Sequence, residues 1–177
     1  MDTVQRLLDT MMRLQMQPDA HTMSTVLCSC AKLGDGSRAH RYFQTFTETF
    51  SIEPDLLAFN SLIDALGKSK DPATCEMWIQ KMIESGISPN VATYTSVIHS
   101  YSNLGNIAAS DRLLDEMSSA GIEANVYTYS ALLHGCTKSG DIHRAERLFS
   151  HMKASGVEPN IVTYATLINV GGKAKKP

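Results

Sequence analysis

The sequence predicts an all-α fold in which short helices stack as successive repeats. Three observations predict it: segments of the chain match one another at intervals of 35 residues, apolar residues within each segment follow the helical period, and helix start and stop signals return at equivalent positions. One pair of short helices cannot bury its apolar face alone, so stacked neighbours must supply a continuous core. The predicted fold class is therefore an all-α superhelix of helix-turn-helix units, a solenoid.

The repeat is clearest in the C-terminal half, where matching segments begin at Val91, Val126 and Ile161. A segment from Leu56 fits the same spacing, and one from Ala20 begins a unit of 36 residues whose extra residue lies near 47–51. We therefore predict a single array over 1–177, with a half-repeat at 1–19, full repeats at 20–55, 56–90, 91–125 and 126–160, and a partial repeat at 161–177.

Each full repeat contains two helical patterns. Tyr94, Val97, Ile98 and Tyr101 lie at positions i, i+3, i+4 and i+7, which places them on one face of a first helix. A second helix follows, with the same kind of spacing at Ala145, Leu148, Phe149 and Met152. The second helices are expected to begin at helix-capping acids or amides, Asp35, Asp71, Asn106 and Asp141.

Glycines are expected to close the second helices, because glycine readily takes the left-handed conformation that ends a helix; they are Gly86, Gly121 and Gly156. The next first helices then begin at Asp55, Asn90, Asn125 and Asn160. We expect ten helices: an unpaired second helix, four full pairs and a final unpaired first helix.

Composition narrows the possible functions. The formal net charge is −2, so the chain lacks the positive field of a protein that binds any polyanion. Its four cysteines form no CxxC pair and have no histidine pair at metal-ligand spacing, which makes a metal site improbable. No nucleophile, base and orienting group form a catalytic pattern, so we expect no enzyme activity, no cofactor and no small-molecule substrate. No apolar run approaches the roughly 20 residues that cross a bilayer, so membrane insertion is not expected.

Short sequence motifs indicate a family. The V-x-T-Y openings at Val91, Val126 and Ile161 and the G-[IV]-x-P-N closings resemble the pentatricopeptide repeat, and this resemblance extends from about Leu7 to the C-terminus. It implies a right-handed αα superhelix that binds single-stranded RNA in an organelle, one base per repeat. The expected location is a mitochondrion or chloroplast, with the transit peptide absent from this chain.

The resemblance also implies which residues select bases. In that family the fifth and last residues of each unit choose the base, because short polar side chains can reach its Watson–Crick edge. The corresponding pairs here are Ser24 with Asp55, Asn60 with Asn90, Thr95 with Asn125, and Ser130 with Asn160. Under the family's code they imply a site near 5′-G-Y-A-A-3′, where Y is a pyrimidine.

Two further sets of residues are implied. The second position of each unit is expected to pack against bases; it is occupied by His21, Leu57, Ala92, Tyr127 and Val162. Lysines near the ends of first helices are expected to contact phosphates; they are Lys32, Lys68, Lys138 and Lys173.

Structural roles compete with these assignments. The asparagines are good helix caps with or without RNA, and lysines at helix ends are favoured by the helix dipole. The function predicted first is selective RNA binding by an organellar RNA-processing, stability or translation factor. The alternative is a scaffold subunit of a large assembly, such as a mitochondrial ribosome, that binds proteins or structured RNA without the code.

Overall fold

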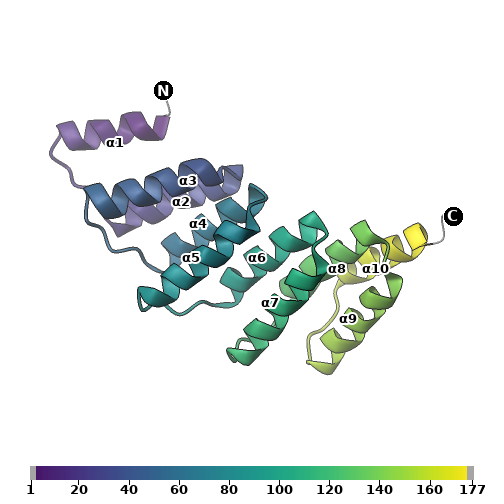
Figure 1. Cartoon of the computed structure of the whole chain (residues 1–177). Helices are drawn as coiled ribbons and strands as arrows, with labels where there is room; N and C mark the ends of the chain where they lie inside the picture. The colour runs from purple at the N-terminus through teal and green to yellow at the C-terminus, as the bar shows by residue number, and fades with distance from the viewer. Residues whose placement is uncertain (1–2, 175–177) are drawn as a thin grey trace. The chain divides into compact units, whose positions relative to one another are not determined.

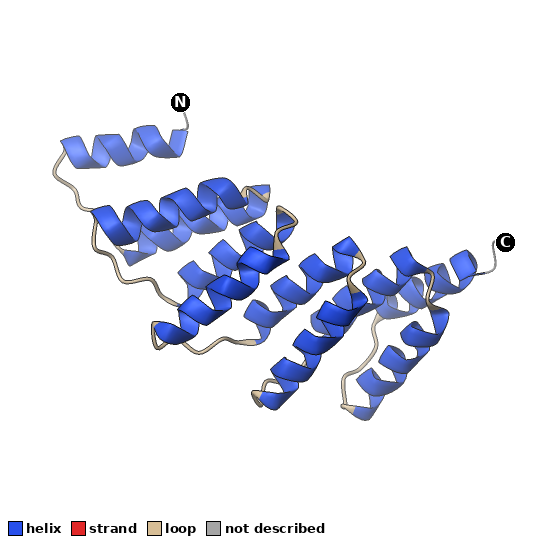
Figure 2. Ribbon diagram, in the orientation of Figure 1, coloured by secondary structure: helices blue, strands red, loops and turns tan. Residues whose placement is uncertain are grey.

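The computed structural model describes residues 3–174, with side chains through residue 172. Within these residues it contains ten α-helices and one π-helical turn, and no strand (Figures 1 and 2). The helices form two compact units, Met1–Ser88 and Pro89–Pro177, each of which is described by itself. The expected helix order, with an unpaired helix at each end of four pairs, is confirmed. The repeat boundaries as a division of one array stay a prediction.

The first unit contains an unpaired helix and two helix pairs. Its elements are α1 (Thr3–Arg13), α2 (Ala20–Leu33), α3 (Gly36–Gln44), the π-helical turn η1 (Thr45–Thr49), α4 (Leu56–Lys68) and α5 (Pro72–Glu84). Helices α2 and α3 form one antiparallel pair, α4 and α5 form the next, and α4 packs against both members of the preceding pair (Figure 1). Stacking of one pair on the next is therefore what builds the core.

The turn η1 accommodates the extra residue of the 36-residue unit. Its i to i+5 hydrogen bond joins Phe50 N to Thr45 O at 3.4 Å, and Ser51 then takes a left-handed backbone with φ of 54°. A π-turn adds one residue to a helix without breaking it. The insertion that the sequence places near residues 47–51 is confirmed, and its structural form is this turn.

The second unit contains two pairs and an unpaired helix: α6 (Val91–Leu104), α7 (Ile107–Ser119), α8 (Val126–Ser139), α9 (Ile142–Ala154) and α10 (Ile161–Ala174). The first helices α6, α8 and α10 stack side by side, with α7 against α6 and α9 against α8 and α10 (Figure 1). Gly86, Gly121 and Gly156, which follow the second helices, have φ between 72° and 76°. The predicted glycine stop signals are confirmed.

Both cores are apolar and close-packed. In the first unit Phe43, Phe59 and Trp78 form an aromatic cluster, in which Phe43 and Trp78 meet edge to face with ring centroids 4.8 Å apart. Cys75 is also buried in the first unit, and burial raises the pKa of its thiol to about 12. Such a thiol stays protonated and packs as a small apolar side chain.

No cluster of three or more His, Cys, Asp or Glu residues in the described part of the chain is placed to hold a metal ion. Between residues 3 and 174, every helix is too short or too polar to span a bilayer.

Candidate nucleic-acid interface

All four predicted last-position residues cap the helix that follows them. The backbone N–H of Ala58 donates to Asp55 Oδ1 at 2.7 Å, and those of Thr93 and Thr163 donate to the side-chain oxygens of Asn90 and Asn160 at 3.1 and 3.0 Å. Asn125 Oδ1 accepts two such bonds, from Tyr127 N at 3.0 Å and Thr128 N at 3.1 Å. The capping role proposed from the sequence is therefore present, and it fixes each side chain at the start of a first helix.

In the first unit the structure brings one predicted pair into direct contact. Ser24 Oγ, on α2, donates a hydrogen bond to Asp55 Oδ1 at 3.1 Å, although the two residues are 31 positions apart. Ser24 is only 3% exposed, whereas Asp55 is exposed. The carboxylate is thus the part of this pair that faces solvent.

In the second unit a third residue joins another predicted pair. Thr95 Oγ1, on α6, lies 2.7 Å from Thr128 Oγ1, on α8, and Thr128 Oγ1 donates to Asn125 Oδ1 at 3.2 Å. Thr128 was not among the residues predicted to select bases. The sequence signal that could have identified it is the threonine of the V-x-T-Y opening, at the third position of the unit.

The other two predicted pairs are Ser130 with Asn160 and Asn60 with Asn90. Ser130 is half-buried on α8, where its Oγ donates to Val126 O at 2.7 Å in the same helix, while Asn160 is exposed at the start of α10. Asn60 is half-buried on α4 in the first unit, and its predicted partner Asn90 caps α6 in the second.

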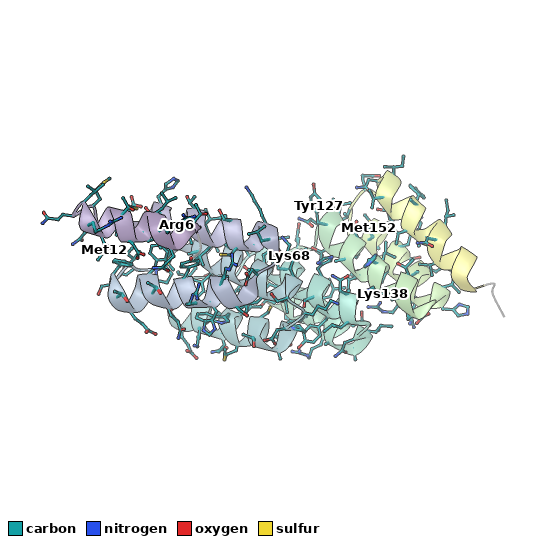
Figure 3. All side chains as sticks on the ribbon, turned by 90° about the horizontal axis from the view of Figure 1, so that it is seen from above. Arg6, Met12, Lys68, Tyr127, Lys138 and Met152 are labelled. Carbon is teal, nitrogen blue, oxygen red and sulfur yellow. The ribbon has the colours of Figure 1, made fainter. Side chains whose placement is uncertain are left out.

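The second-position residues all lie in the first turn of a first helix and are exposed to solvent; they are His21, Leu57, Ala92, Tyr127 and Val162. Tyr127 is the largest of them and is 73% exposed (Figure 3). Large apolar groups at these positions are therefore outside the core. Their accessible surfaces are available for stacking against a base.

Two of the predicted phosphate-contacting lysines bind protein groups. Lys68 Nζ donates to Ala31 O at 2.9 Å and pairs with Asp64 at 2.7 Å, and Lys138 Nζ donates to Asn103 O. Each lysine thereby satisfies a carbonyl at the C-terminus of the preceding first helix, where the helix dipole is negative. Lys32 is exposed in the last turn of α2, and the side chain of Lys173 lies outside the described residues.

The outer side of the second unit holds a separate feature. A hollow of about 450 Å³ lies between α7 and α9, and its lining includes Asp115, Glu123 and His151. The Tyr129 hydroxyl reaches into this region, 2.8 Å from His151 Nδ1 and 3.2 Å from Ser155 Oγ. Because its ionisable lining is largely acidic, this hollow is a poor match for phosphates.

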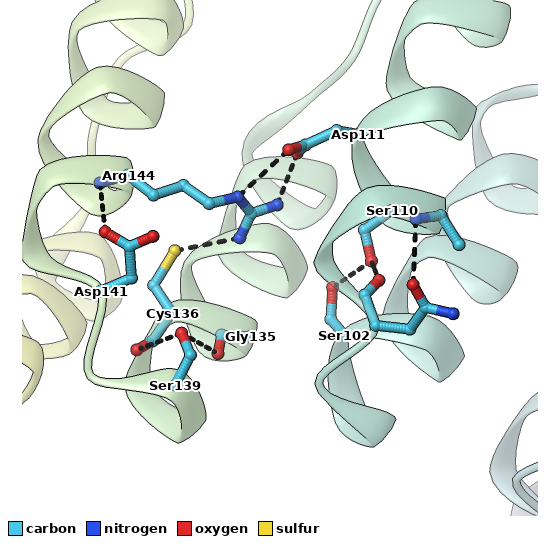
Figure 4. Close-up of polar contacts among 10 residues, drawn as sticks. Ser102, Ser110, Asp111, Gly135, Cys136, Ser139, Asp141 and Arg144 are labelled. Atoms are coloured by element: carbon cyan, nitrogen blue, oxygen red, sulfur yellow. Dashed lines mark hydrogen bonds and ion pairs between the residues drawn. The ribbon is translucent and has the colours of Figure 1, made fainter.

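An ion pair bridges the same two helices. Arg144 on α9 reaches Asp111 on α7 through Nε and Nη2, with Nε 3.3 Å from Oδ2, and its Nη1 donates to Cys136 Sγ at 3.1 Å (Figure 4). Burial alone would lower the pKa of Arg144, but its hydrogen bond to Asp111 and the negative charge of that carboxylate raise the pKa above its ordinary value. The guanidinium therefore stays charged and links adjacent repeats.

Family models match most of the chain. A model described as the pentatricopeptide repeat domain matches residues 6–69 and 112–174, the PPR repeat family matches 54–103, and the PPR repeat matches 92–122.

Solved structures show the same fold. The chain aligns with the pentatricopeptide repeat protein PPR10 in complex with an 18-nt psaJ RNA element, at TM-score 0.86 and 24% identity over 97% of this chain and 25% of that one. A structure of the pentatricopeptide repeat protein PPR10 from maize gives TM-score 0.81 at 24% identity over 97% of this chain and 24% of that one. The PPR domain of Arabidopsis thaliana protein-only RNase P 1, in complex with tRNA, gives 0.76 at 14% identity over 96% and 89%.

The chain spans about a quarter of the length of PPR10 and most of the RNase P domain. At these identities the likeness establishes the fold, an all-α solenoid, as the sequence predicts. The family models, which extend over most of the sequence, establish the relationship: this chain belongs to the pentatricopeptide repeat family.

Proposed function

We propose that this chain binds single-stranded RNA and selects bases with the fifth and last residues of its repeats. The observation that carries the proposal is the pairing at the starts of the first helices. Ser24 and Asp55 bond directly, and Thr95 and Asn125 are joined through Thr128, although each pair is separated by about 30 residues of sequence. The PPR10 and RNase P domains of the same fold were solved with RNA, which supports the ligand class.

The chemistry of the first pair favours guanine. Ser24 donates its hydroxyl hydrogen bond to Asp55, and the carboxylate, which is the part of the pair that faces solvent, offers a base only acceptor lone pairs. The Watson–Crick edge of guanine carries adjacent donors, N1–H and the N2 amino group. This acceptor-only carboxylate therefore suits guanine as the first base.

The chemistry of the third pair favours adenine. Thr128 donates to Asn125 Oδ1, so the hydroxyl proton between the two threonines comes from Thr95. Thr95 then offers an acceptor, and Asn125, whose oxygen is occupied by the helix cap, offers its NH2 group. Adenine presents the complementary groups, an N6 amino donor beside the N1 acceptor. With Asn60 and Asn90 for a pyrimidine and Ser130 and Asn160 for a second adenine, the proposed site is 5′-G-Y-A-A-3′.

The test is fluorescence-anisotropy binding to short RNAs that contain GUAA or GCAA, with scrambled RNAs as controls, for the wild type and Thr95→Asn. We expect selective binding by the wild type and a third-base preference that moves from adenine toward a pyrimidine in the variant. One good base contact contributes about 1–3 kcal/mol of discrimination. Equal binding to scrambled RNA would refute the proposal.

The biological setting belongs to the same proposal. We place the protein in a mitochondrion or chloroplast, where it acts in RNA processing, stability or translation by holding a strand rather than by catalysis, with proteins of an organellar ribonucleoprotein as possible co-ligands. Import of the full-length protein, fused to a fluorescent protein, into isolated mitochondria and chloroplasts tests the location. Failure to enter either organelle would reject it.

One observation favours a second function. Lys68 and Lys138 are bonded to backbone carbonyls, and the net charge is −2, so the phosphate-binding capacity of the chain is small. These features suit a scaffold subunit that contacts proteins without using the code. In the binding experiment this alternative corresponds to no RNA binding above the scrambled controls.

A further inference from the structure

Threonine at the third position of a repeat has a role beyond helix capping. In the second unit Thr128 lies three residues after Asn125, and Thr163 lies three residues after Asn160. Each forms a complete capping box: the side-chain oxygen of the asparagine accepts from the threonine N–H and hydroxyl, and the backbone N–H of the asparagine donates to the threonine Oγ1. Both threonines are fully buried. The two positions are therefore matched in sequence, capping geometry and burial.

They differ in what the hydroxyl contacts on the preceding repeat. Thr128 Oγ1 lies 2.7 Å from Thr95 Oγ1, the fifth residue of the repeat that ends at Asn125. The equivalent fifth residue for Thr163 is Ser130, whose hydroxyl donates to Val126 O in its own helix. Within the part of the chain that the structure describes, Thr128 thus connects the two base-selecting residues of one repeat, whereas Thr163 holds only one.

This connection orients the polar groups of Asn125. Its Oδ1 accepts from Tyr127 N, Thr128 N and Thr128 Oγ1 at 3.0, 3.1 and 3.2 Å. Three donors on one atom exclude the flipped amide, because NH2 has no lone pair to accept from an N–H. The amide must therefore present its NH2 group away from the helix. The Thr128 hydroxyl oxygen also accepts a hydrogen bond from the Thr95 hydroxyl.

We infer that Thr128 is a positioning residue for base selection: it orients Thr95 as a hydrogen-bond acceptor and Asn125 as a hydrogen-bond donor. Together these two residues match the N6 amino donor and the N1 acceptor of adenine. This inference rests on the proposed function. The first unit offers a contrast, since Asp55 is followed by Ala58 and accepts directly from Ser24. A carboxylate has two equivalent oxygens and needs no residue to choose between them.

The experiment measures the base preference of one repeat. Anisotropy titrations use four RNAs that differ only in the third base of 5′-GUNA-3′, with wild type, Thr128→Val, Thr128→Ser and Thr163→Val. Valine keeps the volume of threonine and removes the hydroxyl. We expect Thr128→Val to reduce the ratio of the affinities for the adenine and guanine RNAs by about tenfold, the effect of losing one hydrogen bond. Thr128→Ser keeps a hydroxyl and should show the wild-type ratio.

The matched Thr163→Val variant removes the same capping hydroxyl without touching Thr95, so the third-base ratio should stay at the wild-type value. Loss of folded protein lowers affinity for all four RNAs alike and leaves their ratio intact, and circular dichroism melting monitors it. A wild-type ratio in Thr128→Val would overturn the inference while leaving the proposed function standing. A wild type without any base preference would remove the proposed function and this inference together.

Discussion

At the residue scale, Asn125 uses the two ends of its side-chain amide for different purposes. The oxygen caps α8 through Tyr127 N and Thr128 N, while the NH2 group is left for a ligand. The observed capping role and the proposed base-selecting role are therefore compatible in one side chain. A substitution that keeps the capping oxygen and replaces the NH2 group can separate the two roles.

Asn125→Asp is that substitution. Aspartate and asparagine are equally good N-caps, so the free energy of unfolding should stay within about 0.5 kcal/mol of wild type. The outward group changes from donor to acceptor, which makes the Thr95 repeat resemble the Ser24 and Asp55 pair, so the third-base preference should move from adenine toward guanine. Urea denaturation and anisotropy check the two parts. An unchanged base preference in a stable variant would leave Asn125 with capping alone.

At the scale of elements, neighbouring repeats are joined by polar contacts as well as by apolar packing. Arg144 extends from α9 to Asp111 on α7, and its side chain is 4% exposed, against 49% for Asp111 (Figure 4). Removing one partner of a buried pair leaves an uncompensated charge, which costs more than removing both. Because Arg144 is far more buried than Asp111, leaving Arg144 unpaired should cost more stability than leaving Asp111 unpaired.

We expect Asp111→Ala to destabilise the protein by about 2 kcal/mol, since it leaves the guanidinium buried and unpaired; the value is below that of a fully buried pair because Asp111 is half exposed. Arg144→Leu should cost less, about 1 kcal/mol, because leucine is apolar and Asp111 can hydrate. Urea unfolding of both variants and of the double variant measures this. Equal losses in the two single variants would contradict the assigned asymmetry.

At the scale of the whole molecule, the charge of the chain limits the RNA affinity expected from the proposed function. The net charge is −2, and two of the candidate lysines are bonded to carbonyls of the preceding repeat. Each phosphate neutralised by a single-strand binder contributes about −0.7 to the slope of log K against log salt. With four candidate lysines the slope should be no steeper than about −3.

Variants of Lys32 and Lys138 can be compared to test which lysines contribute to the salt dependence of RNA binding. Lys32→Gln should reduce the slope by about 0.7 if the exposed ammonium neutralises a phosphate, with little change in stability. Lys138→Gln should instead cost about 0.5–1 kcal/mol of stability, because the carbonyl of Asn103 loses its charged donor, and should change the slope less. RNA titrations at several salt concentrations measure the slope, and urea denaturation measures the stability. A larger change of slope in Lys138→Gln than in Lys32→Gln would assign the phosphate contact to Lys138.

The helices and their ends could be predicted from the sequence alone. Helix starts at Asp55 and Asn125, the glycine stops and the position of the extra residue at η1 all follow from interactions between residues two to five apart. Such local hydrogen bonds are specified by residue type and spacing, so they can be read without knowing the fold. The fold class could be predicted from the same signals, because their recurrence every 35 residues is typical of stacked helix pairs.

The tertiary structure decided which groups meet between repeats. Leu133 and Ile168 occupy equivalent positions in α8 and α10, yet the first is 0% exposed and the second 75%; among the described helices α8 packs against α6, α9 and α10, whereas α10 packs against α8 and α9. Likewise, the Thr95 hydroxyl finds Thr128, whereas the equivalent Ser130 bonds to its own helix. Contacts across more than 30 residues depend on how two helices pack, and small differences in packing redirect a hydroxyl or a lysine. Sequence spacing alone contains no information about that choice.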